Sequence, residues 1–455
     1  YALSLPEGMD DAPRLKRWPL HVKLHGRGGT RNEVRFFAEH AGKAPQKEQM
    51  WIQLDVFGRT DNAYRWSGET DVFEAIADVR RRHRIDDRRV TLWGFSMGGA
   101  GAWHLGLHHP SKWSSVGPGA GFVDFYKYQN QTEQRPPHEH KALRIYDAID
   151  YTLNLYDVPI CTYGGELDAQ LVASTSVVEK AEKLKVPVKL LVGPGVGHKF
   201  HPDSYKEFMA FHQVQAIDGR PKYPGRKLIR FITYTLKYNQ CDWLTIEEID
   251  RQYEAATVEG GVFPDGVMRL RTKNVKAMRI NRDMALKIEI DGKKLELGAA
   301  AEGLLPNVYF QREPEGWRDL GYEESREFFR NPNLHKRHNL QGPIDDAFME
   351  PFVCVRGTGT PWSKQNADWS SWTLSRFEHE FDKWLRGRVP VIDDTELGEE
   401  DIASKNLILF GDPAQSTADC RIESAESARI EIGALIKTKA AVCGALRKEE
   451  LSYLF

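Results

Sequence analysis

The sequence has few of the features that mark metal, redox, membrane or nucleic-acid proteins. Its five cysteines are widely scattered and form no C-x-x-C pair, which argues against a zinc ribbon or a thiol redox motif. No run of 18 apolar residues is present, so no transmembrane helix is predicted. The formal net charge of −2 gives no overall attraction to nucleic acid or to a membrane surface, and we expect neither partner. The oligomeric state stays open. So does the compartment, because the chain begins at Tyr1 rather than at methionine: a secreted or periplasmic protein and a cytoplasmic one both fit.

The stretch Gly94-Phe95-Ser96-Met97-Gly98 has the G-x-S-x-G pattern of a nucleophile elbow. The residues before it, 89–93, are β-branched and apolar and predict a buried strand, whereas 99–105 predict a helix. This strand, turn and helix are the context that the elbow requires, because the glycines allow a sharp turn that exposes the serine. The sequence therefore predicts Ser96 as a catalytic nucleophile.

A base and an orienting carboxylate follow in the order expected for such a serine. Two further strands are predicted: 158–165, which ends in glycines, and 186–192, which runs into the glycine-containing loop 193–198. Asp168 comes just after the first of them and His198 just after the second. The order Ser, Asp, His is that of the α/β-hydrolase triad, and catalytic groups of open α/β sheets gather at the carboxyl ends of strands. We therefore expect Ser96, Asp168 and His198 to act together.

Each of these assignments has an alternative. Asp168 also suits the N-cap of a helix, and Glu166 or Asp124 could replace it as the acid. His198 and His201 are three residues apart, but no cysteine or carboxylate cluster with ligand spacing accompanies them, so no metal is expected. His201 is instead assigned to the wall of the site or to the start of the following segment.

Negative charge that develops on the substrate requires N–H donors. One is expected from the backbone of Met97, the residue after the nucleophile. The other is expected from the loop His25-Gly26-Arg27-Gly28-Gly29, with Arg27 as the donor. This loop lacks the G-x-G-x-x-G spacing and the Walker lysine, which argues against phosphate binding. His25 and two aromatic residues on a Gly- and Asn-bearing loop, Tyr64 and Trp66, are candidates for the substrate pocket, as is His201.

Four motifs taken together resemble the α/β-hydrolases of the prolyl-oligopeptidase-like and esterase-like branch: residues 25–29, 94–99, 164–168 and 197–198. The resemblance covers roughly residues 1 to 215. It implies a serine hydrolase that forms an acyl-enzyme intermediate and needs no cofactor. The peptidases of that branch carry a long β-propeller before the catalytic domain, and no repeated propeller blades are visible in this sequence. The resemblance therefore favours an esterase.

Changes in pattern along the chain predict four parts. Residues 1–217 form the α/β-hydrolase domain, and a Pro- and Gly-bearing connection separates them from a mainly β accessory domain at 218–341, where Asp265-Gly266 and Asp291-Gly292 mark tight turns. Residues 342–412 alternate strand, helix, strand, helix and strand, which predicts a small parallel βαβαβ unit. Its first helix, 368–385, has candidate apolar positions at Trp369, Trp372, Leu374, Phe377, Phe381, Trp384 and Leu385. Residues 413–455 have no assigned role, although 428–442 are weakly helix-prone.

Two functions fit these residues. The first is a serine carboxylesterase that acts on small acyl esters or on acyl and feruloyl groups of polysaccharide. The second is a serine peptidase or aminopeptidase of the prolyl-oligopeptidase-like type. A peptidase that recognises a free amino terminus needs acidic residues in its pocket, for which the candidates are Asp55, Asp61, Glu69 and Asp71.

Overall fold

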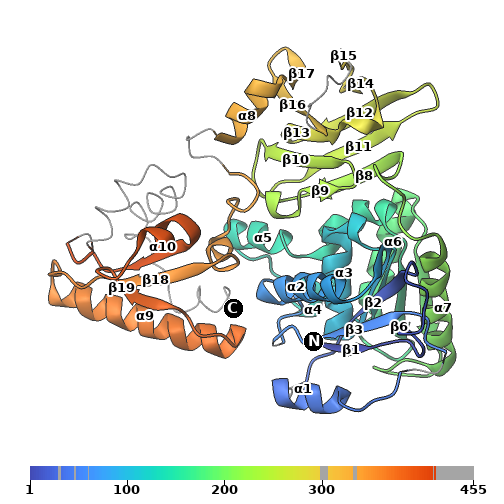
Figure 1. Cartoon of the computed structure of the whole chain (residues 1–455), viewed down its shortest axis with the longest axis horizontal. Helices are drawn as coiled ribbons and strands as arrows, with labels where there is room; N and C mark the ends of the chain where they lie inside the picture. The colour runs from blue at the N-terminus through green and yellow to red at the C-terminus, as the bar shows by residue number, and fades with distance from the viewer. Residues whose placement is uncertain are drawn as a thin grey trace. The chain divides into compact units, whose positions relative to one another are not determined.

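The structure, a computed structural model, describes residues 1–28, 32–45, 48–59, 61–297, 306–330, 336–412 and 414–416. The chain divides into two compact units. The first runs to the end of the helix that closes at Arg330 and also contains 336–341, and the second begins at Gly342 (Figure 1).

A seven-stranded sheet forms the centre of the N-terminal half of the first unit. Its strand order is β1-β3-β2-β4-β5-β6-β7, with β1 antiparallel to β3 and all other pairs parallel. Apolar side chains line one face of the inner strands: on β2, Leu20 and Val22 are fully buried on one face, while His21 and Lys23 lie on the other. The strands are β1 (Ala2–Ser4), β2 (Trp18–Leu24), β3 (Ile52–Val56), β4 (Ile85–Phe95), β5 (Ser115–Gly119), β6 (Cys161–Gly165) and β7 (Lys189–Gly193).

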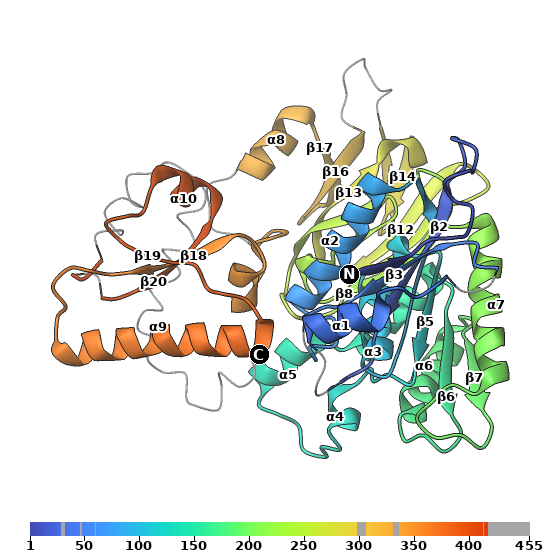
Figure 2. The same ribbon diagram turned by 60° about the horizontal axis from the view of Figure 1, so that its bottom comes forward.

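Helices cover both faces of this sheet (Figure 2). Helices α2, α3 and α6 supply side chains to the larger apolar cluster, while α7 supplies Phe208 and Met209 to a second cluster against the other face. The order of strands and the helices between them match the α/β-hydrolase fold class predicted from the sequence. The helices are α1 (Glu33–His40), α2 (Ser67–Arg82), α3 (Met97–His108), α4 (Phe125–Tyr128), α5 (Pro137–Arg144), α6 (Leu171–Leu184) and α7 (Pro202–Asp218), with 3-10 segments at Pro110–Lys112 (η1) and Ala148–Asp157 (η2).

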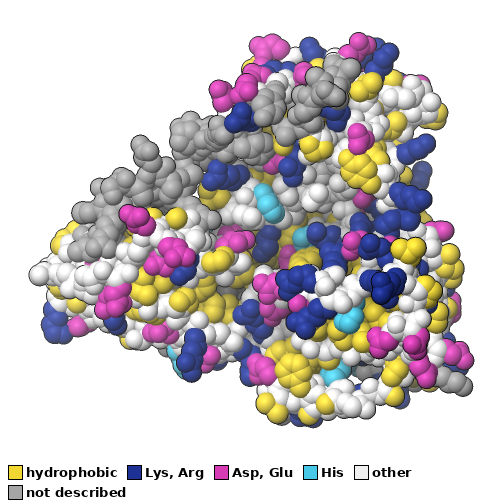
Figure 3. Space-filling view, viewed as in Figure 1, with side chains coloured by type: hydrophobic (Ala, Val, Ile, Leu, Met, Phe, Trp, Pro, Cys, Tyr) yellow, Lys and Arg dark blue, Asp and Glu magenta, His cyan; other side chains and the backbone are white. Residues whose placement is uncertain are grey.

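The basic run at 80–84 begins in the last turn of α2. Arg80 pairs with Asp87 at 2.7 Å, and Arg81 and Arg82 pair with Asp78 at 2.7 and 2.9 Å. Positive side chains at a helix C-terminus also interact favourably with the helix dipole. Acidic and basic side chains are interspersed over the molecular face drawn in Figure 3, in keeping with the near-zero net charge.

Two five-stranded sheets follow and share one apolar core. Their orders are β17-β16-β13-β10-β9 and β15-β14-β12-β11-β8, and Phe231, Ile246 and Phe310 from the two sheets are fully buried in one cluster. The turns predicted at 265–266 and 291–292 join antiparallel neighbours, but β12 and β14 pair in parallel, an exception to the predicted antiparallel region. The elements are β8 (Leu228–Thr233), η3 (Leu236–Tyr238), β9 (Gln240–Cys241), β10 (Leu244–Ile249), β11 (Ala256–Val262), β12 (Val267–Lys273), β13 (Val275–Asn281), η4 (Arg282–Met284), β14 (Lys287–Ile290), β15 (Lys293–Glu296), β16 (Asn307–Glu313), β17 (Gly316–Leu320) and α8 (Tyr322–Arg330).

Buried hydrogen bonds join this β region to the α/β part. Asn154 in η2 is fully buried; its amide nitrogen donates to the carbonyl oxygens of Leu107 (2.7 Å) and Ile232 (3.0 Å), and its oxygen accepts from the Ile232 N–H at 2.7 Å. The Asn154 side chain therefore provides hydrogen-bond partners for backbone groups at the end of α3 and on the edge strand β8. Tyr234 and Tyr238 of the β region also belong to the large apolar cluster of the α/β part.

The second unit contains a three-stranded parallel sheet of order β19-β18-β20. It has the predicted strand and helix alternation. On α9, Leu374, Phe381 and Leu385 are buried as predicted, whereas Trp369, Trp372 and Trp384 are 42 to 57% exposed and do not belong to the core. The elements are η5 (Ile344–Phe348), β18 (Phe352–Arg356), α9 (Lys364–Leu385), β19 (Val391–Asp393), α10 (Glu399–Ser404) and β20 (Asn406–Phe410).

Cys161, Cys241 and Cys354 are buried free thiols. Burial raises the pKa of Cys161 and Cys354 to about 12, so both remain protonated and inert near neutral pH. Cys420, Cys443 and the helix predicted at 428–442 lie outside the described residues. Among the helices that the structure describes, none combines the length and apolar character needed to cross a membrane.

Candidate active site

Ser96 lies in a sharp turn between the end of β4 and the start of α3. Its backbone has φ 60° and ψ −122°, a strained conformation for a residue with a side chain. The turn is held by the Ser96 N–H, which donates to the Gly119 carbonyl oxygen at 2.8 Å. A Cβ on Gly98 would lie 2.0 Å from the Leu24 carbonyl oxygen, so only glycine fits there. The elbow geometry predicted from G-x-S-x-G is present.

The structure brings Ser96, His198 and Asp168 together. The Ser96 Oγ lies 2.8 Å from His198 Nε2, and His198 Nδ1 lies 2.7 Å from Asp168 Oδ2. An ionised carboxylate only accepts hydrogen bonds, so the proton belongs on Nδ1 and leaves Nε2 to accept from the serine hydroxyl. The Asp168 side chain is 5% exposed, and its other oxygen accepts the Gln170 N–H at 2.9 Å, whereas the His198 side chain is 44% exposed.

The two alternative acids have other partners. Glu166 accepts the Gly195 N–H at 2.7 Å and thereby supports the loop that carries His198. Asp124 is the N-cap of α4, where it accepts the Lys127 N–H at 3.1 Å. Neither carboxylate has a hydrogen bond with the His198 ring among the described contacts. The geometry thus favours Asp168 over both.

The two predicted N–H donors flank the serine. Arg27 and Met97 both line the cavity that contains Ser96. Met97 is the first residue of α3, where backbone N–H groups have no partner within the helix. Gly26 lies so close to the nucleophile that a Cβ there would be 3.3 Å from Ser96 Cβ. Gly29, the last residue of the predicted loop, lies outside the described residues.

The cavity beside Ser96 has a volume of about 270 Å³. Phe122 and Tyr128 form part of its wall, with their rings stacked at a centroid distance of 4.2 Å and an interplanar angle of 22°. Asp168 is the only carboxylate among its lining residues, which are Arg27, Ser96, Met97, Ala120, Phe122, Tyr128, Asp168, Gln170 and His198.

The residues predicted for the substrate pocket lie beside this cavity rather than in its lining. Tyr64 is fully buried, and its hydroxyl accepts the His25 N–H at 2.8 Å. The ring of Trp66 packs against Tyr146 with centroids 5.7 Å apart. His201 directly precedes α7 without capping it through its side chain. Sequence reasoning missed Ala120, Phe122, Tyr128 and Gln170 as lining residues. Of these, only Gln170 follows a strand predicted above, the one at 158–165.

The described residues contain no group of three or more His, Cys, Asp or Glu side chains arranged to hold a metal ion. The four acids considered for binding an amino terminus also lie outside the cavity lining. Asp55 pairs with Lys23 at 3.2 Å, Asp71 with Arg59 at 2.8 Å, and Asp61 accepts the Gly28 N–H at 3.3 Å.

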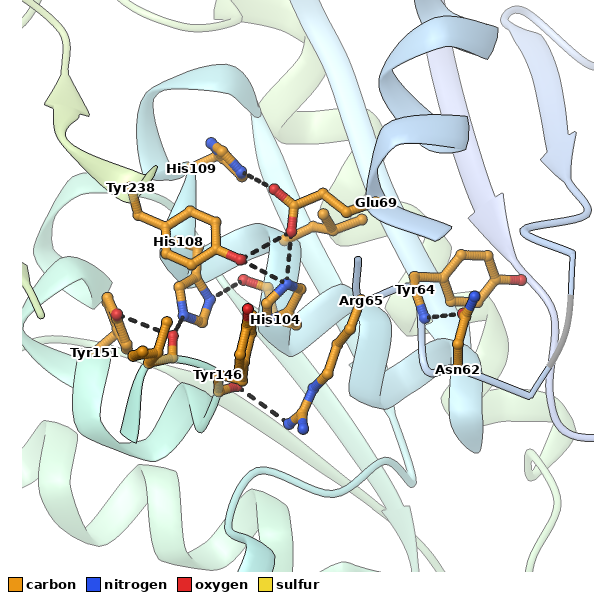
Figure 4. A network of polar contacts seen from close by, with 12 residues as sticks. Asn62, Tyr64, Arg65, Glu69, His104, His108, His109, Tyr146, Tyr151 and Tyr238 are labelled. Atoms are coloured by element: carbon orange, nitrogen blue, oxygen red, sulfur yellow. Dashed lines mark hydrogen bonds and ion pairs between the residues drawn. The ribbon is translucent and has the colours of Figure 1, made fainter. Parts of the chain in front are cut away.

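Glu69, the fourth acid, is buried at the start of α2 and accepts three hydrogen bonds (Figure 4). The donors are His104 Nε2 at 2.8 Å, His109 Nε2 at 2.9 Å and the Tyr238 hydroxyl at 3.0 Å. Burial favours a raised pKa, but the hydrogen bonds from the two histidines outweigh it and hold the pKa of Glu69 well below its usual range. Burial lowers the pKa of both histidines, against the effect of Glu69. Glu69 therefore joins α2, α3 and the β region.

Replacing Glu69 by alanine is expected to lower the free energy of unfolding by about 3–5 kcal/mol, because three buried donors lose their acceptor. Urea unfolding monitored by circular dichroism measures the change. The matched control is Glu74→Ala, which removes an exposed carboxylate from the same helix and should cost less than about 0.5 kcal/mol. Equal small losses in both variants would contradict a structural role for the Glu69 cluster.

Comparison with known proteins places the site in a family. A model described as the prolyl oligopeptidase family matches residues 62–216, the segment that holds Ser96, Asp168 and His198. The resemblance predicted from the motifs is confirmed for this part of the chain, which has the fold of the α/β-hydrolases of that branch and is similar to its serine hydrolases.

Several solved structures are similar to parts of the chain. A ferulic acid esterase is 17% identical, with 47% of this chain and 90% of that chain covered and a TM-score of 0.34. An S-formylglutathione hydrolase from Agrobacterium tumefaciens is 16% identical, with 47% and 88% covered and a TM-score of 0.36. The acylaminoacyl peptidase of Pyrococcus horikoshii is 15% identical; 44% of this chain and 38% of that chain are covered, with a TM-score of 0.35. No curated protein matches the sequence.

Proposed function

We propose that this protein is a serine carboxylesterase in which Ser96, His198 and Asp168 form the catalytic triad. The observation that carries the proposal is the continuous chain of hydrogen bonds from Ser96 Oγ through the His198 ring to Asp168, with distances of 2.8 and 2.7 Å. Nucleophile, base and orienting carboxylate are then all within hydrogen-bond reach, as acyl transfer requires.

The geometry supports a two-step reaction. The Ser96 Oγ attacks the ester carbonyl carbon while His198 Nε2 takes the hydroxyl proton. The N–H groups of Met97 and Arg27 donate hydrogen bonds to the carbonyl oxygen, which becomes negatively charged. The C–O bond to the alcohol then breaks, and the His198 proton passes to the leaving oxygen. In the second step His198 takes a proton from water as the water oxygen attacks the acyl carbon. The bond between the acyl carbon and Ser96 Oγ then breaks, His198 returns the proton to Oγ, and the acid leaves. These residues need no cofactor or metal for this chemistry.

The charge of the cavity lining favours an ester over a peptide with a free amino terminus. Among the described residues that line the cavity, the one carboxylate, Asp168, is already bonded to His198, so none of these residues offers a carboxylate to a substrate ammonium group. The peptidase alternative rests on the match to the prolyl oligopeptidase family model. A panel of p-nitrophenyl esters and aminoacyl anilides separates the two: esters should be turned over, and faster hydrolysis of the anilides would replace the proposal with the peptidase.

The aromatic wall of the cavity favours a particular kind of acyl group in the substrate. Phe122 and Tyr128 present a stacked aromatic surface next to Ser96, and aromatic pairs contribute beyond the apolar area they bury. We include in the proposal an aromatic acyl group of the feruloyl type, carried by a small alcohol or a polysaccharide. Small acyl esters remain substrates that use less of the cavity.

Replacing Tyr128 by alanine is expected to lower kcat/KM for a feruloyl ester about fivefold relative to p-nitrophenyl acetate, because the larger acyl group loses an aromatic contact worth about 1 kcal/mol. Steady-state kinetics on both esters measure the ratio, and the acetyl ester reports any damage to the triad. A second control is Tyr156→Ala, which removes an exposed tyrosine from η2, outside the cavity lining. An unchanged ratio in Tyr128→Ala would exclude this wall as the acyl site.

A further inference from the structure

Tyr64 is fully buried directly beneath the loop that carries Arg27. Its hydroxyl accepts the His25 N–H at 2.8 Å, and its proton is within reach of two carbonyl oxygens, those of Val56 at 3.3 Å and His25 at 3.4 Å. One hydroxyl therefore joins the end of β3 to the residue that follows β2. The His25 ring lies between two further backbone oxygens, at 2.6 Å from that of Phe57 and 2.8 Å from that of Gly26.

The fold provides a close-fitting space for the Tyr64 ring. A Cβ on either Gly58 or Gly101 would lie 2.6 Å from a carbon of the Tyr64 ring, so the loop after β3 and helix α3 both press against it. The segment that delivers the ring is strained: Ala63, Tyr64 and Trp66 all have positive φ angles, between 51° and 58°. Asn62 supports this conformation, since its side-chain oxygen accepts the Tyr64 N–H at 2.9 Å (Figure 4).

The residue fixed by Tyr64 precedes the proposed charge-stabilising donor by two positions. Between them, Gly26 lies against Ser96, with 3.3 Å between a Cβ placed there and the serine Cβ. A small shift of His25 would therefore move the Arg27 N–H relative to the carbonyl oxygen that it must reach. We propose that Tyr64 is a positioning residue, whose hydroxyl sets the 25–27 backbone for stabilisation of the oxyanion. The proposal rests on the proposed function of Ser96.

Loss of the hydroxyl affects the transition state more than the bound ester. Without the hydroxyl, the His25 N–H loses its hydrogen bond to Tyr64, which favours a shift of the loop. A ground-state carbonyl gains little from the Arg27 N–H, whereas the oxyanion depends on it; loss of a whole donor of this kind lowers kcat about 10²- to 10³-fold. A displaced donor should cost less, so Tyr64→Phe is expected to lower kcat about 10- to 100-fold and leave KM nearly unchanged.

The test compares Tyr64→Phe with Tyr151→Phe. Tyr151 is also fully buried in the same apolar cluster, and its hydroxyl donates to the Ile145 carbonyl oxygen at 3.0 Å, away from the 25–27 loop. Both variants lose one buried hydroxyl and the hydrogen bonds that it makes, so their melting temperatures should fall by similar amounts. Only Tyr64→Phe should lose kcat, and its affinity for a trifluoromethyl ketone, whose adduct with Ser96 carries an oxyanion, should fall by the same factor.

Three outcomes bear on this proposal separately from the triad. Wild-type kcat and inhibitor affinity in Tyr64→Phe would overturn it, and so would equal losses of kcat in both tyrosine variants. A rise in KM with unchanged kcat would assign Tyr64 to substrate binding instead and also overturn it. If Ser96→Ala kept full activity, the proposed function itself would fail, whatever the tyrosine variants do.

Discussion

Replacing Ser96 by alanine is expected to lower kcat for p-nitrophenyl ester hydrolysis about 10⁴- to 10⁶-fold, because the acyl group then has no oxygen to which it can transfer. The change removes one hydroxyl and leaves the strained elbow in place, so the melting temperature should stay within a few degrees of wild type. Steady-state kinetics on purified protein give the ratio. A fluorophosphonate probe should label the wild-type protein and fail to label the variant.

The matched control for this experiment is Ser204→Ala on α7, a serine that does not line the cavity and should leave kcat unchanged. A Ser96→Ala protein that melts cooperatively and still hydrolyses esters within tenfold of wild type would remove the central proposal. Labelling of the variant by the fluorophosphonate would point to a different nucleophile.

The elbow and its partners were predictable because each depends on short stretches of sequence. Glycines around Ser96, an apolar strand before it and small residues after it are all local features, and the chain order of Asp168 and His198 needs only the strand ends. The structure places these residues in one hydrogen-bonded chain. Short stretches of sequence could not decide between Asp168 and Glu166 as the acid, because the answer depends on how far the 166–170 turn reaches toward the loop after β7.

The roles of the residues around the site could not be predicted, because they depend on packing between segments that are far apart in the sequence. Tyr64 on a Gly- and Asn-bearing loop was predicted to line a pocket, yet Gly58 and Gly101, 43 positions apart in the chain, form the space that buries it. Glu69 was a candidate for binding an amino terminus, but it is buried. Its hydrogen-bond partners are His104 on α3, His109 at the C-cap of that helix, and Tyr238, which lies 169 residues after Glu69 in the chain.

The β region shows the same division between local and distant information. The turns at 265–266 and 291–292 follow from Asp-Gly pairs, which favour tight hairpins. The parallel pairing of β12 with β14 depends on which strands meet after the chain has folded, and alternation of side chains carries no information about it. On α9, helical spacing alone could not separate the buried Leu374 from the exposed Trp372, since both are apolar.

Replacing Asp168 by asparagine is expected to lower kcat about 10⁴-fold while the protein stays folded, because an amide favours the wrong tautomer of the base. The asparagine NH₂ group donates where the carboxylate accepted, so the His198 proton moves to Nε2, which then no longer accepts the Ser96 hydroxyl proton. The hydrogen bond from the Gln170 N–H to the side-chain oxygen at position 168 can be kept. Steady-state kinetics at a fixed pH measure the loss, with KM expected to change far less than kcat.

Two conservative variants are the controls for this assignment. Asp124→Asn keeps a good helix N-cap and should leave kcat within about twofold, and Glu166→Gln should lower kcat by less than about tenfold, because it weakens only the support of the His198 loop from the Gly195 N–H. Because all three changes replace a carboxylate by its amide, a general effect of lost charge would appear in each of them. If Asp168→Asn kept kcat within tenfold of wild type while one of the other two lost a thousandfold, the acid of the triad would have to be reassigned to that residue.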